Sequence, residues 1–148
     1  MVKITGNRFS VNMISAVTNR GELVFSTFKG RFVTPVFLKF LNRLIQHQRR
    51  KVFLIIDGHP VHRAIRVQQW LSQHSDEIEM FFLPGYSPER NPDELLNQDL
   101  KANIFKTKRP VSKAELDAML RATLRSFQRQ PKRIQGYFNH PLLQYAAA

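Results

Sequence analysis

Two stretches near the start of the chain carry the spacing and residue types of β-strands. Residues 9–17 (FSVNMISAV) and 22–28 (ELVFSTF) are rich in β-branched and aromatic side chains. Between them, the TNRG segment supplies Asn19 and Gly21, two residue types that tolerate the backbone of a tight turn. The pattern predicts a β-hairpin.

The following residues alternate between helical and strand patterns. Residues 34–48 have apolar positions at helical spacing and begin with Thr34, which is expected to cap the helix ahead of a proline. The apolar run at 51–57 is too short for a helix, and its continuous apolarity predicts a strand covered on both faces. Residues 61–74 predict a second helix and residues 77–84 a second strand. This order favours an α/β fold in which the two strands are parallel neighbours and helices pack on the sheet.

Prolines and capping residues divide the C-terminal third of the chain. A turn-rich segment at 85–94 leads to Pro92, the expected first residue of a helix that Asn91 caps and that ends near Phe105. The SKAE sequence at 112–115 is a capping box for a further helix. The tail beyond residue 130 is weakly specified. The side chains expected to face the core from the 61–74 helix are Val61, Ala64, Ile65, Val67, Trp70 and Leu71, and from the last helix Leu116, Met119, Leu120, Thr123, Leu124 and Phe127.

The length of 148 residues and a hydrophobic content of 43% fit one domain, 1–148, with its own core. The chain has no cysteine, which excludes disulfides and thiolate metal sites. Its first residues lack the apolar run of a signal peptide, and no stretch approaches the roughly 20 apolar residues of a membrane span. We therefore expect a soluble, cytoplasmic protein with no membrane partner.

Charge is unevenly distributed along the chain. The net charge of +12 and the pI of about 10.8 favour a polyanionic partner such as nucleic acid. Residues 1–50 carry nine Lys or Arg and one acid, residues 51–100 carry four and eight, and residues 101–148 carry ten and two. Carboxylates weaken plain phosphate binding, but carboxylates that hold a divalent metal against a phosphodiester would explain an acidic centre. The acids of 76–79 are expected to be a solvated turn instead.

Asp57 ends the most apolar strand, where ligands of open α/β sheets gather. It is a candidate ligand, although an aspartate at this position is equally compatible with a cap on the next helix. His59 and His62 are three residues apart and suggest a metal pair. Pro60 separates them, however, and no cysteine or further histidine cluster completes a zinc site. We interpret them as hydrogen-bonding residues that line the site.

A second carboxylate must come from the ERNPDE segment at the start of the third helix. Asp93 and Glu94 are adjacent and lie about 100° apart on that helix, so one of them is expected to face Asp57. The apolar side defined by Leu96 and Leu100 mildly favours Asp93, but the pattern alone leaves both open. Two carboxylates with water and phosphate oxygens satisfy the oxygen-ligand preference of Mg²⁺.

The segments LIIDGHPVHRAIRVQQWL and FFLPGYSPERNPDELLNQDLK resemble the catalytic core of bacterial insertion-sequence transposases related to the mariner superfamily. The resemblance covers nearly the whole chain, loosely in the hairpin and closely over 52–101, and LPxYSPExNPxE ahead of a helix is its specific motif. It implies a ribonuclease H-like mixed sheet flanked by helices and a DDE metal triad with Mg²⁺ (or Mn²⁺). The implied activity is metal-dependent strand cleavage and strand transfer in DNA transposition.

The resemblance also assigns individual residues. Asp57 matches the second catalytic aspartate of the family, and Glu94 matches the final acid, with 36 residues between them. This assignment takes precedence over the helical pattern and leaves Asp93 in reserve. Many relatives have a tryptophan where Asn97 stands here. The residues implied to border the site are Tyr86, Ser87 and Asn91.

The first acid of the family has no counterpart in this sequence. In the family it precedes the hairpin, whereas no aspartate precedes Asp57 here, and the single acid among the first 50 residues, Glu22, is expected to be exposed. We therefore expect an N-terminally truncated domain that lacks the first catalytic strand and is weakly active or inactive alone. In the fold that the resemblance implies, this strand lies between the hairpin and the strand that ends at Asp57, and unpaired backbone there would be costly. For this reason we expect residues 2–5 or a neighbouring chain to fill that position.

The implied partner is DNA, namely transposon ends and target, bound by a homodimer associated with the bacterial nucleoid. The residues expected to contact phosphates without reading sequence are Arg63, Lys101, Lys106, Lys108 and Arg109. Two other functions stay open. One is a non-catalytic nucleic-acid-binding or assembly module on the same fold, and the other is a ribonuclease or repair nuclease.

Overall fold

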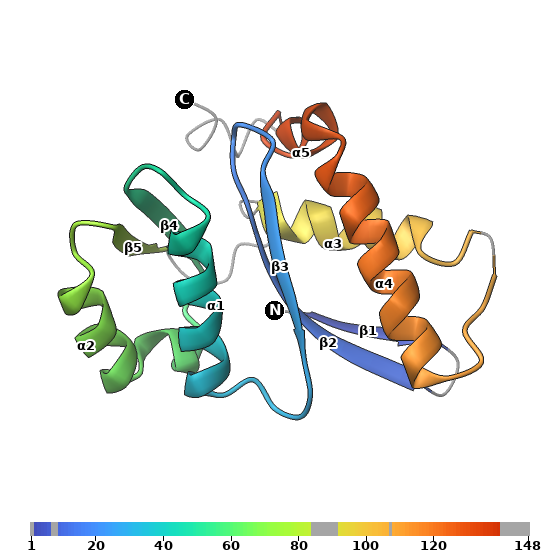
Figure 1. The fold of residues 1–148 in the computed structure, drawn as a ribbon, viewed down its shortest axis with the longest axis horizontal. Helices are drawn as coiled ribbons and strands as arrows, with labels where there is room; N and C mark the ends of the chain where they lie inside the picture. Colours follow the sequence, from blue (N-terminus) through green and yellow to red (C-terminus); the bar gives the residue numbers. More distant parts are fainter. Residues whose placement is uncertain (1, 7–8, 84–91, 107, 140–148) are drawn as a thin grey trace. The chain divides into compact units, whose positions relative to one another are not determined.

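The computed structural model is a mixed α/β fold of strands flanked by helices (Figure 1). It describes residues 2–6, 9–83, 92–106 and 108–139. Two compact units make up the chain: unit 1 is Met1–Gly30 with Pro88–Ala148, and unit 2 is Arg31–Ser87. The α/β class expected from the sequence is confirmed, while a single domain for the whole chain stays a prediction. No helix among the described residues is long and apolar enough to cross a bilayer.

Unit 1 contains an antiparallel sheet of β1 (Val2–Gly6), β2 (Phe9–Val17) and β3 (Leu23–Phe28), in the order β1-β2-β3. β2 and β3 form the predicted hairpin. Its turn needs a glycine at Gly21, where φ is 91° and an added Cβ would lie 2.5 Å from the carbonyl oxygen of Pro131.

β1 pairs with the free edge of the hairpin over its whole length, from Val2 opposite Met13 to Gly6 opposite Phe9. Residues 2–5 therefore form a strand beside the hairpin. The backbone groups of β2 that would otherwise be unpaired on this side gain partners in this way. That residues 2–5 fill the position between the hairpin and the strand that ends at Asp57 stays a prediction, because the two strands belong to different units.

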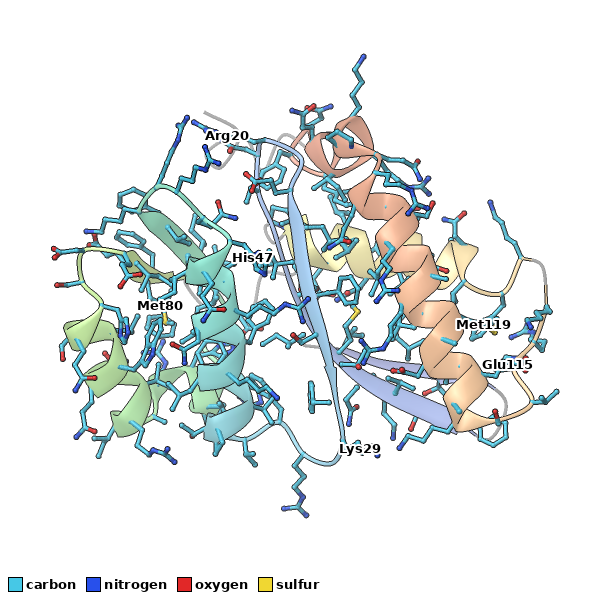
Figure 2. The ribbon with its side chains drawn as sticks, viewed as in Figure 1. Arg20, Lys29, His47, Met80, Glu115 and Met119 are labelled. Atoms are coloured by element: carbon cyan, nitrogen blue, oxygen red, sulfur yellow. The ribbon has the colours of Figure 1, made fainter. Side chains whose placement is uncertain are left out.

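The described part of unit 1 also contains the helices α3 (Pro92–Asn103), α4 (Lys113–Gln128) and α5 (Pro131–Gly136). The predicted capping box begins α4, because the Ser112 hydroxyl accepts a hydrogen bond from the Glu115 N–H at 3.1 Å. Glu115 lies in the first turn of α4 and Met119 one turn later (Figure 2). The core packs α3 and α4 against the sheet and includes Ile4, Met13, Phe25, Leu96, Leu100, Leu116, Leu120, Leu124 and Phe127.

Unit 2 contains β4 (Val52–Ile56) and β5 (Ile78–Phe82), which pair in parallel as predicted. The helices are α1 (Thr34–Gln46) and α2 (Ile65–Gln73), and a short 3-10 helix, η1 (Pro60–Arg63), follows β4. The buried apolar side chains of this unit are Phe37, Phe40, Leu41, Leu44, Val67, Trp70 and Ile78.

Several local predictions for unit 2 are wrong. Thr34 does not cap α1, because the helix begins one residue earlier than expected and Val33, which has no capping side chain, is the N-cap. The helix predicted from residue 61 is broken at Ala64, which has an extended backbone (ψ 147°) and separates η1 from α2. The side chains of α2 therefore point in other directions than they would in one continuous helix. As a result Ile65, expected in the core, is 75% exposed.

The prediction that β4 is covered on both faces is also wrong. Alternate side chains of a strand point to opposite faces, and on one face Phe53 is 61% exposed and Ile55 is 38% exposed. A continuous apolar run indicates that a strand tends to be buried. It does not show which helices or strands pack on each face.

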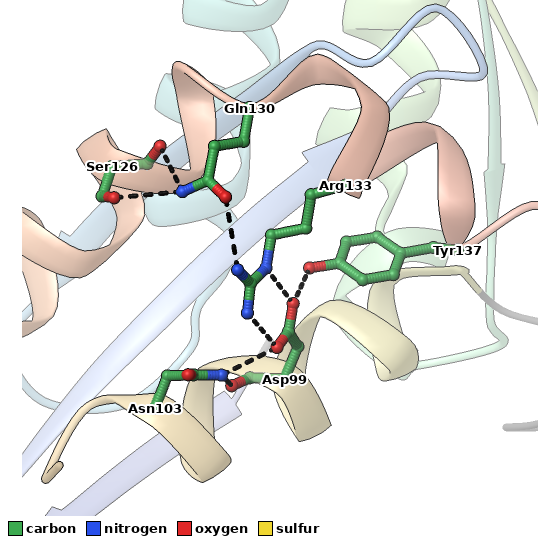
Figure 3. Close-up of polar contacts among 6 residues, drawn as sticks. All are labelled: Asp99, Asn103, Ser126, Gln130, Arg133 and Tyr137. Carbon is green, nitrogen blue, oxygen red and sulfur yellow. Dashed lines mark hydrogen bonds and ion pairs between the residues drawn. The ribbon is translucent and has the colours of Figure 1, made fainter.

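A cluster of polar side chains fastens α5, which the sequence did not predict, to α3 (Figure 3). The Asp99 carboxylate accepts two hydrogen bonds from the Arg133 guanidinium, each at 2.6 Å, and one from the Tyr137 hydroxyl at 2.6 Å. Asn103 donates a fourth at 2.8 Å. The hydrogen bonds from Arg133 are the main cause that lowers the pKa of Asp99 below its ordinary value, while burial acts in the opposite direction.

Asp99→Asn is expected to lower the free energy of unfolding by about 1–3 kcal/mol near neutral pH, because a charged acceptor of several hydrogen bonds is removed. Since the folded-state pKa of Asp99 is lowered, its stabilisation is present above the unfolded pKa of about 3.9 and is lost as the pH falls through the folded value. Urea unfolding of wild type and variant should therefore converge at acid pH.

The matched control for this prediction is Asp117→Asn. Asp117 forms an ion pair with Arg121 four residues later at 2.7 Å, and both side chains are more than a third exposed. Its loss is expected to cost less than about 1 kcal/mol. An equal loss in both variants, or a difference for Asp99→Asn that persists in acid, would contradict the assignment.

Candidate active site

The Asp57 carboxylate directly follows β4 and is held by the residues that come after it. Its Oδ1 accepts a hydrogen bond from the His59 backbone N–H at 3.2 Å and lies 3.2 Å from Nδ1 of His62. The same Nδ1 lies 3.1 Å from the Asp57 carbonyl oxygen. The Asp57 side chain nevertheless remains 48% exposed, so the carboxylate is oriented and accessible at once.

Asp57 does not cap the short helix that follows. The N-cap of η1 is His59, whose Nδ1 accepts a hydrogen bond from the Val61 N–H at 3.1 Å. The alternative interpretation of Asp57 as a helix cap is therefore not what the structure shows.

His62 is one of the two buried polar side chains among the described residues, and it is 8% exposed. Its ring centroid lies 4.6 Å from that of Phe37 and 5.7 Å from that of Phe32. Burial is the main cause that lowers the pKa of His62 below its ordinary value, and the nearby Asp57 opposes this effect. Burial thus favours the neutral form of the imidazole.

His59 and His62 are neighbours, with ring centroids 5.5 Å apart. Each Nδ1 already has a partner in its own loop, and within the described residues no group of three or more His, Asp or Glu side chains could hold a metal ion. Both histidines therefore form hydrogen bonds within their own loop, and their place beside a metal site stays a prediction.

The second candidate acid begins α3 in unit 1, where Asp93 and Glu94 occupy the first turn. The Ser15 hydroxyl of β2 donates a hydrogen bond to Asp93 Oδ1 at 2.5 Å, which ties that carboxylate to the sheet. Glu94 is half-buried and makes no hydrogen bond or ion pair with the part of the chain that the structure describes. The choice of Glu94 over Asp93 as the metal ligand stays a prediction.

Asn97, one turn after Glu94, is a buried residue that was not expected to contribute to the site. It is 3% exposed, and its Oδ1 is the one buried side-chain oxygen or nitrogen without a hydrogen-bond partner among the described residues. The signal in the sequence for this position is that Asn97 stands where many relatives have a tryptophan.

Asp57 belongs to unit 2 and Glu94 to unit 1, so their convergence on one metal ion stays a prediction. Tyr86, Ser87 and Asn91, the residues implied to border the site, lie outside the described residues.

The five basic residues expected to bind phosphate differ in their surroundings. The Arg63 guanidinium lies over the Phe82 ring at 4.0 Å, and that of Arg109 lies over a ring at 4.9 Å. Lys108 is 3.6 Å from a Glu115 carboxylate oxygen. Lys101 and Lys106 are exposed and pair with no acid that the structure describes.

Residues 2–117 match the sequence profile of the DDE superfamily endonucleases. The catalytic domain of the Mos1 mariner transposase has a similar fold, with a TM-score of 0.65 and 15% identity, over 99% of this chain and 79% of that one. A comparison with curated protein sequences gives no match.

A second solved structure is similar to this chain: the simian T-cell lymphotropic virus intasome in complex with PP2A regulatory subunit B56 gamma. Its matching chain has a TM-score of 0.63 and 18% identity over 80% of this chain, which spans 44% of the length of that one. At these identities the two solved structures establish the fold, which is the ribonuclease H-like fold of integrase and transposase catalytic domains.

The contact between Ser15 and Asp93 gives a test of which acid is structural. In a double-mutant cycle, Ser15→Ala and Asp93→Ala are expected to be coupled by about 0.5–2 kcal/mol in the free energy of unfolding, because they share a hydrogen bond. Ser15→Ala and Glu94→Ala are expected to be additive within about 0.5 kcal/mol. Chemical denaturation measures both cycles. If Ser15 is coupled to Glu94 and not to Asp93, then Glu94 is the structural acid and Asp93 the candidate metal ligand.

Proposed function

This chain belongs to the DDE superfamily of endonucleases, and we propose from that premise that it is the catalytic core of a DNA transposase. The proposed reaction is metal-dependent cleavage of a DNA strand followed by strand transfer. The observation that carries the proposal is the Asp57 carboxylate, which lies at the end of β4 within the matching residues, oriented by hydrogen bonds yet exposed.

Enzymes of this family use divalent metal ions, and the side chains present fit such an ion. The described contacts engage only one oxygen of Asp57 and neither oxygen of Glu94. Carboxylate oxygens with free capacity are the ligands that Mg²⁺ and Mn²⁺ prefer. We propose that Asp57 and Glu94 hold the metal, which would activate water and stabilise charge on the phosphate.

The proposed partner is DNA, in the form of transposon ends and target. The net charge of +12 supports it, and so do structural neighbours named as a transposase and an intasome. Lys101 and Lys106 are the strongest candidates for phosphate contacts, because their ammonium groups have no acidic partner among the described residues. A homodimer on the two ends of the element is part of the same proposal.

We further propose that this chain alone binds DNA but cleaves it weakly. No aspartate precedes Asp57, where the family has its first acid. Two carboxylates balance the charge of one divalent ion, and a second ion would bind poorly.

DNA binding is expected to be salt-dependent and insensitive to sequence. The double variant Lys101→Ala with Lys106→Ala should bind a labelled duplex more weakly and reduce the slope of log K against log salt by about 1–2, because up to two phosphate contacts are lost. Fluorescence anisotropy across a salt series measures both quantities. Lys51→Ala is the control, since Lys51 is a half-exposed lysine already 3.4 Å from a Glu79 oxygen. A change in Lys51→Ala as large as in the double variant would contradict the assignment.

Metal binding is expected to require Asp57 and Glu94 together. Crystals soaked in Mn²⁺ should show anomalous density between the two carboxylates, and Asp57→Asn or Glu94→Gln should abolish it, while Asp93→Asn should keep it. Density that survives Glu94→Gln and disappears with Asp93→Asn would show that the final acid is Asp93. Strong Mn²⁺-dependent nicking by the wild-type chain would contradict the expected weak activity, and no metal-dependent nicking with retained DNA binding would favour the non-catalytic module.

A further inference from the structure

The two oxygens of the Asp57 carboxylate have different surroundings. Oδ1 accepts the His59 backbone N–H and faces Nδ1 of His62, both at 3.2 Å. Oδ2 has no hydrogen-bond or ion-pair partner among the residues that the structure describes. The carboxylate is therefore held by one oxygen and open at the other.

The position of Nδ1 indicates which of the two ring nitrogens of His62 carries a hydrogen. It lies 3.1 Å from the Asp57 carbonyl oxygen, and a carbonyl oxygen only accepts hydrogen bonds. Nδ1 must therefore carry the hydrogen, which faces both the carbonyl oxygen and Oδ1 of the same residue. His62 is a donor to Asp57.

The His62 ring has little freedom to move away from this contact. It is 8% exposed and lies against the rings of Phe37, Phe32 and His59, with centroids 4.6, 5.7 and 5.5 Å away. A donor that is already fixed in place loses little entropy when it holds its acceptor. His59 differs, because it contributes a backbone N–H that any residue except proline would keep at that position.

We propose that His62 is a positioning residue: its Nδ1–H, with the His59 N–H, fixes Oδ1 of Asp57 so that Oδ2 alone is presented to a divalent cation. The proposal rests on the proposed function, because it takes Asp57 as a metal ligand. It adds that the ligand is monodentate and that its orientation comes from a buried imidazole five residues later in the chain. Residues that orient a metal ligand in this way typically contribute 10- to 100-fold in metal affinity.

The first experiment needs no metal. Long-range ¹H–¹⁵N NMR of the labelled chain at about pH 8, where imidazoles are neutral, reports which ring nitrogen carries the proton. We expect His62 in the Nδ1–H form. A His62 ring protonated on Nε2 alone cannot donate to Asp57 and would overturn the proposal.

The second experiment compares Mn²⁺ affinity, by calorimetry, in the wild-type chain and three variants. His62→Leu keeps an apolar side chain but removes the donor, and we expect about 10- to 100-fold weaker binding. His62→Asn places an amide N–H near the position of Nδ1, and we expect affinity within about threefold of the wild type. This rescue would not occur if the imidazole served only to fill space.

The third variant, His74→Asn, is the matched control. His74 makes the same kind of contacts away from Asp57, since its Nδ1 lies 2.7 Å from the Trp70 carbonyl oxygen and its ring stacks on that of Trp70 at 4.1 Å. We expect it to lower the thermal stability as a His62 substitution does, but to leave Mn²⁺ affinity unchanged. All titrations are made on chains shown to be folded by circular dichroism.

Asp57→Asn separates this inference from the proposed function. Mn²⁺ binding that does not depend on Asp57 would overturn the metal site itself, and the NMR measurement would still decide whether His62 holds the carboxylate. Binding that depends on Asp57 but is equally strong in His62→Leu would overturn the positioning role alone.

Discussion

The properties of the site depend on how the Asp57 carboxylate is held at the end of β4. A carboxylate on an exposed strand end can rotate freely, and its free rotation lowers its affinity for a cation because that freedom is lost on binding. Here a backbone N–H and an imidazole N–H both point at Oδ1. The backbone N–H carries no charge and burial favours the neutral imidazole, so these donors fix the direction of the carboxylate and leave its charge in place. An arginine in the place of His62 would orient the Asp57 carboxylate but would also neutralise its negative charge.

The acids of this chain differ in how much hydrogen-bonding capacity they have left. Asp99 accepts from Arg133, Tyr137 and Asn103, so both of its oxygens are occupied by structural donors. Asp93 is tied to β2 through the Ser15 hydroxyl. Asp57 keeps one oxygen open, and Glu94 has no described partner. A metal ion can bind only where oxygens have free lone pairs, and this difference supports the pair Asp57 and Glu94 more directly than charge or position in the sequence.

Features of the fold set by short-range contacts could be predicted from the sequence, and those set by distant residues could not. The hairpin and the capping box at Ser112 each follow from residues within a few positions of one another, and the parallel pairing of β4 with β5 follows from the alternation of strand and helix patterns along the chain. α5 is fastened by contacts between Asp99 and Arg133, 34 residues apart, which no local pattern reveals. His62 was expected beside the site, but its contact with Asp57 depends on η1, a 3-10 turn that also displaces Ile65 from the core.

The net positive charge of the chain makes it more significant that hydrogen-bond donors, and not a cationic side chain, hold Asp57. In a chain of net charge +12, an exposed carboxylate attracts cationic side chains, and an ion pair would compete with a metal. The structure places the nearby Arg63 guanidinium over the Phe82 ring instead, 4.0 Å from its centroid. Lys51 lies near Glu79 and Phe53, and Arg133 is engaged by Asp99. Because Arg63 and Lys51, in the same unit as Asp57, have these other partners, the negative charge of Asp57 supports the proposed binding of a divalent ion, which carries twice the charge of any side chain.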